Sequence, residues 1–106
     1  MLLTRLSLAV PLALLAVPAL AQDVQYELIN GSGLTLMEFY AGPAGEGGGG
    51  DDLLGANVLA SGETGTVAIP DGTLCERDLR FVFEDGSERV ETTNICDQAS
   101  LSLSAQ

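Results

Sequence analysis

Apolar and polar residues alternate along much of the chain beyond residue 22. In residues 24–30 (VQYELIN), Val24, Tyr26 and Leu28 fall on one face. A period of two is typical of a β-strand with one buried face. A second run, residues 34–40 (LTLMEFY), follows across the turn signal Asn-Gly-Ser-Gly. We therefore expect these two runs to pair as a β-hairpin.

The second run does not keep a single apolar face. Leu34 and Leu36 point to one side, whereas Met37 and Phe39 point to the other. A strand buried on both sides would account for this pattern. A β-bulge near Met37 would also account for it, because one extra residue reverses the alternation.

Further strand-like runs recur at short spacing, with Gly, Pro and Asp turn signals between them and no amphipathic helix longer than one turn. Regularly spaced short strands favour an all-β fold, here a small antiparallel β-sandwich of about seven strands. The expected strands are residues 24–30, 34–40, 57–60, 64–69, 79–84, 87–95 and 100–104.

The dipeptide Asp85-Gly86, between two alternating runs, predicts a hairpin with a two-residue type I′ turn. That turn fixes the pairing and places Cys75 directly opposite Cys96 as a non-hydrogen-bonded pair, where Cα atoms lie about 4.5 Å apart. A cross-strand disulfide between the two cysteines is therefore predicted. A bulge near residues 92–94 would slip the cysteines by one position, so that the bridge would run diagonally or between sheets.

The same register assigns faces to the two strands of this hairpin. Phe81 and Val90 form a pair on the side that faces the core, together with Leu79 and Phe83. Arg80 lies across from Glu91 on the side that faces water, where the two form a weak charge pair.

The first 21 residues predict a secretory signal peptide. Arg5 precedes an apolar stretch that is too short to span a bilayer, and Ala19-Leu20-Ala21 forms a small-x-small cleavage site. Cleavage after Ala21 would leave residues 22–106 as a single β-sandwich domain, periplasmic or extracellular; an uncleaved anchor is the alternative. An oxidising compartment favours the disulfide over free thiols, and so small a domain needs it for stability.

Negative charge dominates the chain. It contains fifteen Asp and Glu but no His and no Lys, and loss of Arg5 with the leader would give a net charge of 3 − 15 = −12. Such a field repels phosphate backbones and anionic lipid headgroups. We therefore expect no nucleic-acid partner, no membrane insertion after cleavage, and a monomer. The carboxylates must face water, bound cations or a basic macromolecule.

Residues 41–55 (AGPAGEGGGGDDLLG) are rich in glycine and acidic residues. They are unsuited to phosphate because a phosphate loop needs a following helix and usually a cation. An EF-hand is excluded by spacing, but a looser calcium site at Glu46, Asp51 and Asp52 is one hypothesis.

We favour a structural interpretation of the same segment. Residues 47–50 are expected to form a flexible loop, because glycine loses the most conformational entropy on ordering. Asp51 is expected to cap a single helical turn, which Leu53 and Leu54 anchor to one end of the sandwich.

The series YELIN-GSG, LMEFYAGPAGE, DDLLG, LASGETGTVAI, DLRFVFEDG and NIC resembles that of a group of small secreted bacterial proteins of unknown function. The resemblance covers most of residues 22–106, and its motifs are structural: turns, an Asp-Leu-Leu-Gly segment, a cysteine pair and an Asp-Leu-Arg strand. Members of the group often carry an aromatic residue where this chain has its glycines. The resemblance implies no assigned activity.

The residue types needed for most catalytic sites are missing. Without histidine there is no Ser-His-Asp or Cys-His pair, and without lysine there is no Schiff base. Only a carboxylate pair of the glycosidase type remains, and it is not specific among so many acidic residues. We therefore expect no enzyme and no cofactor, but a non-catalytic module that binds or modulates another envelope or extracellular protein. The alternative is a small calcium- or cation-binding protein.

Overall fold

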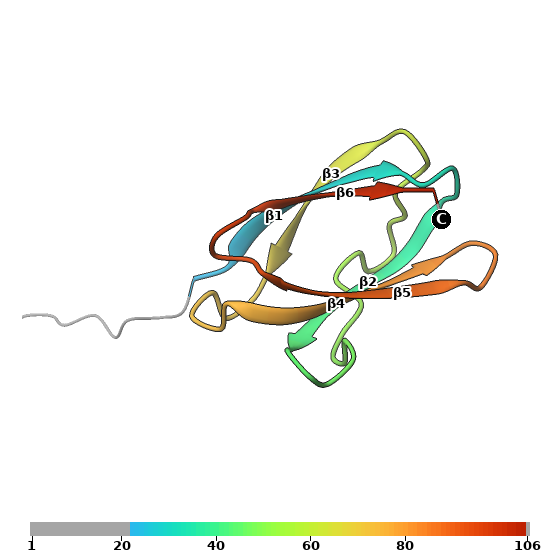
Figure 1. The fold of residues 1–106 in the computed structure, drawn as a ribbon. Helices are drawn as coiled ribbons and strands as arrows, with labels where there is room; N and C mark the ends of the chain where they lie inside the picture. Colours follow the sequence, from blue (N-terminus) through green and yellow to red (C-terminus); the bar gives the residue numbers. More distant parts are fainter. Residues whose placement is uncertain (1–21, 106) are drawn as a thin grey trace, which may run out of the picture.

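Two three-stranded β-sheets pack face to face in the computed structural model of the chain, which describes residues 22–105 (Figure 1). One sheet has the order β3-β1-β6 and the other the order β2-β4-β5. The strands within the described residues are β1 (Val24–Gly31), β2 (Leu36–Pro43), β3 (Thr64–Ile69), β4 (Glu76–Phe83), β5 (Glu88–Asn94) and β6 (Ser100–Ser104).

The predicted all-β sandwich is confirmed, with six strands in place of about seven. Residues 57–60 do not form a strand and contribute only an isolated bridge between Leu59 and Leu36. The predicted signal peptide, residues 1–21, lies outside the described residues.

The predicted hairpin between the first two strands is wrong, because β1 and β2 belong to different sheets. Both edges of β1 are occupied by other strands, and the buried side chain of Asn30 fixes the connection. Its amide nitrogen donates to the carbonyl oxygens of Leu34 (2.8 Å) and Leu59 (2.9 Å). Its oxygen accepts from the Ser32 N–H (3.1 Å) and hydroxyl (2.7 Å). This network turns the chain from one sheet to the other.

The core lies between the sheets, where Tyr26 and Leu28 point inward from β1 as predicted. The bulge at Met37 is also confirmed: Leu36 pairs with Phe83 and Glu38 with Val82, so one extra residue stands between them. Leu36 and Phe39 are therefore both fully buried, whereas Met37 is 40% exposed. Phe39 stacks on Phe81 with ring centroids 5.2 Å apart.

The pairing of β6 with β1 departs from the antiparallel expectation. The two strands run parallel, with Leu28 beside Leu101 and Asn30 beside Leu103. Leu103 is buried and Leu101 packs against the core. The last strand of the fold therefore borders the first.

The turn between β4 and β5 differs from the predicted type I′ turn. Phe83 donates its N–H to the Ser87 oxygen (2.9 Å), and the Gly86 N–H donates to the Phe83 oxygen (2.9 Å). The connection is therefore three residues long, and only Gly86 among them has a positive φ, of 86°. A type I′ turn would require positive φ at Asp85 as well.

The longer turn moves the register by one residue. The Ile95 N–H donates to the Cys75 oxygen (2.9 Å), so Ile95 and not Cys96 stands opposite Cys75. The predicted disulfide is present, with Cα atoms 5.2 Å apart, and runs diagonally across the strands. The slip arises at the turn and not near residues 92–94.

The slip also reverses the faces of β5. Val90, predicted in the core, is 48% exposed beside Arg80 on the outer face. Arg89 and Glu91 instead lie on the inner side, half-buried, and Arg89 donates to the Ser104 carbonyl of β6 (2.7 Å). The predicted contact of Arg80 with Glu91 is therefore wrong.

Candidate functional site

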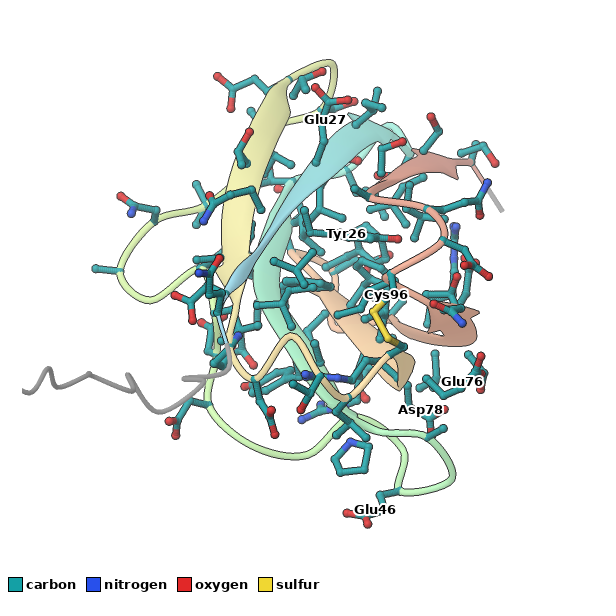
Figure 2. All side chains as sticks on the ribbon, turned by 90° about the vertical axis from the view of Figure 1, so that its left-hand side faces the viewer. Tyr26, Glu27, Glu46, Glu76, Asp78 and Cys96 are labelled. Carbon is teal, nitrogen blue, oxygen red and sulfur yellow. A yellow bond between two sulfur atoms is a disulfide. The ribbon has the colours of Figure 1, made fainter. Side chains whose placement is uncertain are left out.

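The glycine-rich loop between β2 and the Asp-Leu-Leu-Gly segment is held against the outer face of the β2-β4-β5 sheet. Asp78 on β4 accepts the N–H groups of Gly45 (2.9 Å) and Gly47 (2.8 Å), and its other oxygen accepts the Thr92 hydroxyl (2.6 Å). Figure 2 shows Asp78 at the base of this loop and Glu46 at its tip. The Thr92 hydroxyl first, and then the loop amides, hold the pKa of the Asp78 carboxyl below its usual value.

Arg80 supplies a second anchor for the loop. Its Nε donates to the Gly48 carbonyl (3.0 Å), its guanidinium lies 4.0 Å from the centroid of the Tyr40 ring, and its Nη1 contacts Glu88 at 3.3 Å. Gly48 has a φ of +81°, and a Cβ there would lie 2.4 Å from the Arg80 Cβ. The expectation of a flexible loop at residues 47–50 is therefore wrong, since the loop packs on the sheet.

Asp52, and not Asp51, organises the Asp-Leu-Leu-Gly segment. One Asp52 oxygen accepts the N–H groups of Phe39 (3.0 Å) and Leu54 (3.0 Å), and the Leu53 N–H donates to the Phe39 oxygen (2.7 Å). The segment forms turns and not a helical turn. Leu53 and Leu54 pack against the core, as predicted. The segment thus covers the edge of β2.

A groove of about 250 Å³ runs along β3, which is an edge strand of the other sheet. In Figure 1 the yellow-green segment that forms its other wall crosses from β2 to β3. A Cβ on Gly65 would lie 3.0 Å from the Leu59 side chain, so the two walls meet closely at that point. The lining includes Leu53, Leu54 and Val58 from the crossing segment and Thr66, Val67 and Ala68 from β3.

The outer edge of β3 has open main-chain groups. Glu27 donates its N–H to Ala99 beside β6 (2.8 Å), so its neighbour Leu28 directs its own main-chain groups toward β3, at Gly65. By alternation, the N–H and C=O groups of Thr66 and Ala68 point away from β1. Within residues 22–105 no loop makes a main-chain hydrogen bond to either residue.

A second pocket, of about 330 Å³, continues the groove, because both are lined by Leu53. Pro70, just beyond β3, lines this pocket together with Glu46 and Asp51. We call the two pockets and the open edge at Thr66 and Ala68 the edge groove. One end of the edge groove is therefore acidic.

Two of the three residues proposed to bind calcium line the same pocket of the edge groove. Glu46 and Asp51 both line its acidic end, whereas Asp52 is engaged with main-chain N–H groups of β2 and the following turn. Residues 22–105 hold no cluster of three or more His, Cys, Asp or Glu side chains placed to bind a metal ion.

Arg77 supports the acidic end from inside the sandwich, a role that sequence reasoning missed. The buried guanidinium donates to the carbonyls of Ala41 (2.9 Å), Pro70 (2.7 Å), Asp71 (2.6 Å) and Leu74 (2.7 Å). Burial lowers its pKa. The signal in the sequence was its place in the inward series of residues 77, 79, 81 and 83.

The buried hydroxyl of Tyr26 has no hydrogen-bond partner within the described residues. Figure 2 shows the side chain in the interior. Burial, and then the nearby Glu91 carboxylate, raise the pKa of Tyr26, so this hydroxyl stays protonated at neutral pH. The Tyr26 side chain is part of the core and does not line the edge groove.

Comparison of the chain with protein-family models, curated proteins and solved structures found no match. Within residues 22–105 no helix has the length and apolar character needed to cross a membrane.

Proposed function

We propose that this chain is an exported, non-catalytic module that binds another protein of the cell envelope or extracellular space through the edge groove. The observation that carries the proposal is the open edge of β3. Exposed strand edges are usually blocked in native proteins because they invite pairing. Here β2 is covered by Leu53 and Leu59, while β3 is left open beside Val58, which is 48% exposed, and the half-buried Leu53 and Leu54. Such edges and apolar patches are common protein-binding surfaces.

Export is supported by the disulfide and by the character of the first residues. Cys75 and Cys96 are the chain's two cysteines and are bonded to each other, which is typical of oxidising compartments. The signal-peptide pattern of residues 1–21 points to the same compartment. A fusion of residues 1–21 to a reporter that is active only after export would test this support.

The absence of histidine and lysine supports a non-catalytic role, because the common nucleophile-base pairs need one of them. The buried tyrosine and arginine both serve the fold. Arg77 is bound by four carbonyls, and Tyr26 is sealed in the core. Neither residue presents a reactive group to the edge groove.

The proposed function is tested by capture from an envelope extract, followed by binding of the purified candidate to the purified chain. We expect one protein to bind saturably and to be displaced by excess free chain. A variant with Val58→Glu, which places a charge in the apolar part of the groove, should lose that binding. Val90→Glu, on the far outer face, serves as control because Val90 is equally exposed. Equal binding by both variants, or no reconstituted complex, would contradict the proposal.

Cation binding is a second candidate because Glu46 and Asp51 line one pocket and form no ion pair within residues 22–105. Calcium takes about six to eight oxygen ligands, so loop carbonyls and water would have to supply most of them. Calorimetry with CaCl2 tests this candidate. Heat that disappears in Glu46→Gln would support it, and no heat together with an unchanged melting temperature would end it.

A further inference from the structure

We propose that the edge groove binds an extended segment of the partner as a fourth strand of the β3-β1-β6 sheet, antiparallel to β3. A lysine or arginine of that segment lies between Glu46 and Asp51. This inference rests on the proposed function, because it states how the partner is recognised at the same groove.

The main chain of β3 provides the first half of the recognition. Thr66 and Ala68 direct their N–H and C=O groups outward, two residues apart, as the ladder of an added strand requires. An added strand gains affinity from these main-chain hydrogen bonds and specificity from pockets for alternate side chains. Antiparallel pairing is preferred because its hydrogen bonds are slightly more stable than those of a parallel pair.

The walls of the groove specify alternating side chains. Every second residue of an added strand would face inward, over Leu53, Leu54 and Val58. The residues between them would lie beside Thr66 and Glu27, on an outer face whose residues are mostly polar, with Ile29 and Ala68 as apolar exceptions. The partner segment should therefore alternate apolar with small polar residues.

Charge sets the position of the cation in the segment. Glu46 and Asp51 lie at the Pro70 end of the groove, where β3 finishes and where an antiparallel strand begins. Neither carboxylate has an ion-pair partner within residues 22–105, since Arg80 and Arg89 contact Glu88 and Glu91, and Arg77 is bound by carbonyls. A cation at the start of the segment would therefore neutralise charge that the chain leaves unpaired.

The same charge argues against a second copy of this chain in the groove. Pairing two β3 edges would bring two strongly acidic protein surfaces together, and neither chain has a lysine to offer. Like charge of this size opposes association. A partner with a basic, alternating segment fits the groove better.

Strand addition is tested with a labelled synthetic peptide in which an arginine precedes alternating valine and threonine. The peptide is titrated into the full exported chain, and binding is followed by fluorescence anisotropy. We expect saturable binding that weakens at least about tenfold when the amide nitrogens that face β3 are methylated, since methylation removes the ladder donors. It should also weaken when glutamate replaces the arginine. No saturable binding, or equal binding of the methylated peptide, overturns the proposal.

Variants of the chain test the same geometry from the other side. Thr66→Pro removes the outward N–H while leaving the β1–β3 ladder intact, because proline is tolerated where a strand edge faces solvent. Thr66→Ala keeps the N–H and is the matched control. We expect loss of peptide binding in the first and retention in the second. If Thr66→Pro fails to fold, binding of the methylated peptide to the unaltered chain tests the proposal in its place.

The acidic end is tested by the double variant Glu46→Gln with Asp51→Asn, which should bind the arginine peptide about tenfold less tightly and lose most of the salt dependence of binding. Asp97→Asn is the control, since Asp97 is exposed and lines neither pocket of the groove. An equal loss in both would mean that net charge alone acts, and would overturn the assignment of the cation to Glu46 and Asp51.

Failure of strand addition can be told apart from failure of the proposed function. A captured protein that binds Thr66→Pro as well as Thr66→Ala overturns strand addition while the proposed function stands. Peptide binding without any captured protein supports strand addition and contradicts the proposed function. Dimerisation of the chain alone, lost in Thr66→Pro, would place a second copy in the groove and overturn the proposal.

Discussion

Individual residues decide whether the glycine loop lies on the sheet. Gly48 combines a φ of +81° with a carbonyl that accepts from Arg80, and there is no space for a Cβ between the two residues. The glycine is therefore required both by its backbone conformation and by the approach of the loop to Arg80.

We expect Gly48→Ala to lower the free energy of unfolding by about 1–2 kcal/mol, because alanine is strained at positive φ and would contact the Arg80 Cβ. Urea unfolding followed by circular dichroism measures the loss. Gly49→Ala is the control, since that position has open space and no positive φ. Equal stability of the two variants would show that the loop does not rest on Arg80.

Asp78 adds a dependence on pH. The Thr92 hydroxyl and the loop amides lower the pKa of its carboxyl, so folding favours the charged form. This stabilisation is complete above the unfolded-state pKa of about 3.9 and is lost as the pH falls through the lower folded-state pKa.

Asp78→Asn should accordingly melt at a lower temperature than the unaltered chain at pH 7, and the difference should narrow as the pH approaches 3. Scanning calorimetry across this range measures the effect. Asp97→Asn, whose side chain makes no hydrogen bond within the described residues, should follow the unaltered chain throughout. A constant difference between Asp78→Asn and the unaltered chain would contradict the assignment.

At the scale of the elements, the disulfide joins the start of β4 to the end of β5, with a sequence separation of 21. Replacing both cysteines by serine should lower the free energy of unfolding by up to about 3 kcal/mol on the chain-entropy account, and by less where the hairpin already holds its ends together. Urea unfolding with and without reductant measures this. Reductant should not change the stability of the double variant. If reductant also leaves the stability of the unaltered chain unchanged, the expectation is contradicted.

The sequence predicts both ends of a strand correctly where the residues that end the strand lie next to it in the sequence. β3 lies between Gly62 and Pro70, and its alternation is short and regular. The turn after β4 was missed because Asp-Gly occurs in turns of two and three residues. The choice depends on Glu84, whose N–H donates to the Thr35 oxygen (2.9 Å) and whose carboxylate accepts the Thr35 N–H (2.9 Å). That contact joins two turns that are distant in the sequence.

The edge groove could be predicted only in part, because it too depends on contacts between residues that are distant in the sequence. Glu46 and Asp51 stood out because they are acidic and close in sequence, and the structure places them on one pocket. Their relation to β3 was hidden, since it depends on the buried Arg77 donating to the carbonyl oxygens of residues 70 and 71. Arg80 was predicted to face water, and Asp78 drew no prediction, because no local pattern shows that a glycine loop will cover them.

At the scale of the whole molecule, acidic charge opposes compaction. The two ion pairs within residues 22–105 leave most carboxylates without a cation. Salt screens repulsion between exposed charges over a Debye length of about 10 Å at 0.1 M.

We therefore expect the melting temperature at pH 7 to rise with NaCl, and to rise most over the first few hundred millimolar, where the screening length shortens fastest. Differential scanning fluorimetry in NaCl measures this, and matched concentrations of sucrose control for general solute effects. A melting temperature that falls with NaCl would mean that the two ion pairs outweigh the repulsion.

The parallel pairing of β6 with β1 has a consequence for biosynthesis. During synthesis Val24–Gly31 emerges early, yet its neighbour Ser100–Ser104 follows only after β2, β3, β4 and β5. Until then Leu28 lacks the cover of Leu101, and one side of β1 is open to any other unfinished polypeptide. Deleting Ser100–Ser104 would leave this side of β1 uncovered, and such chains should be the first that quality-control proteases remove.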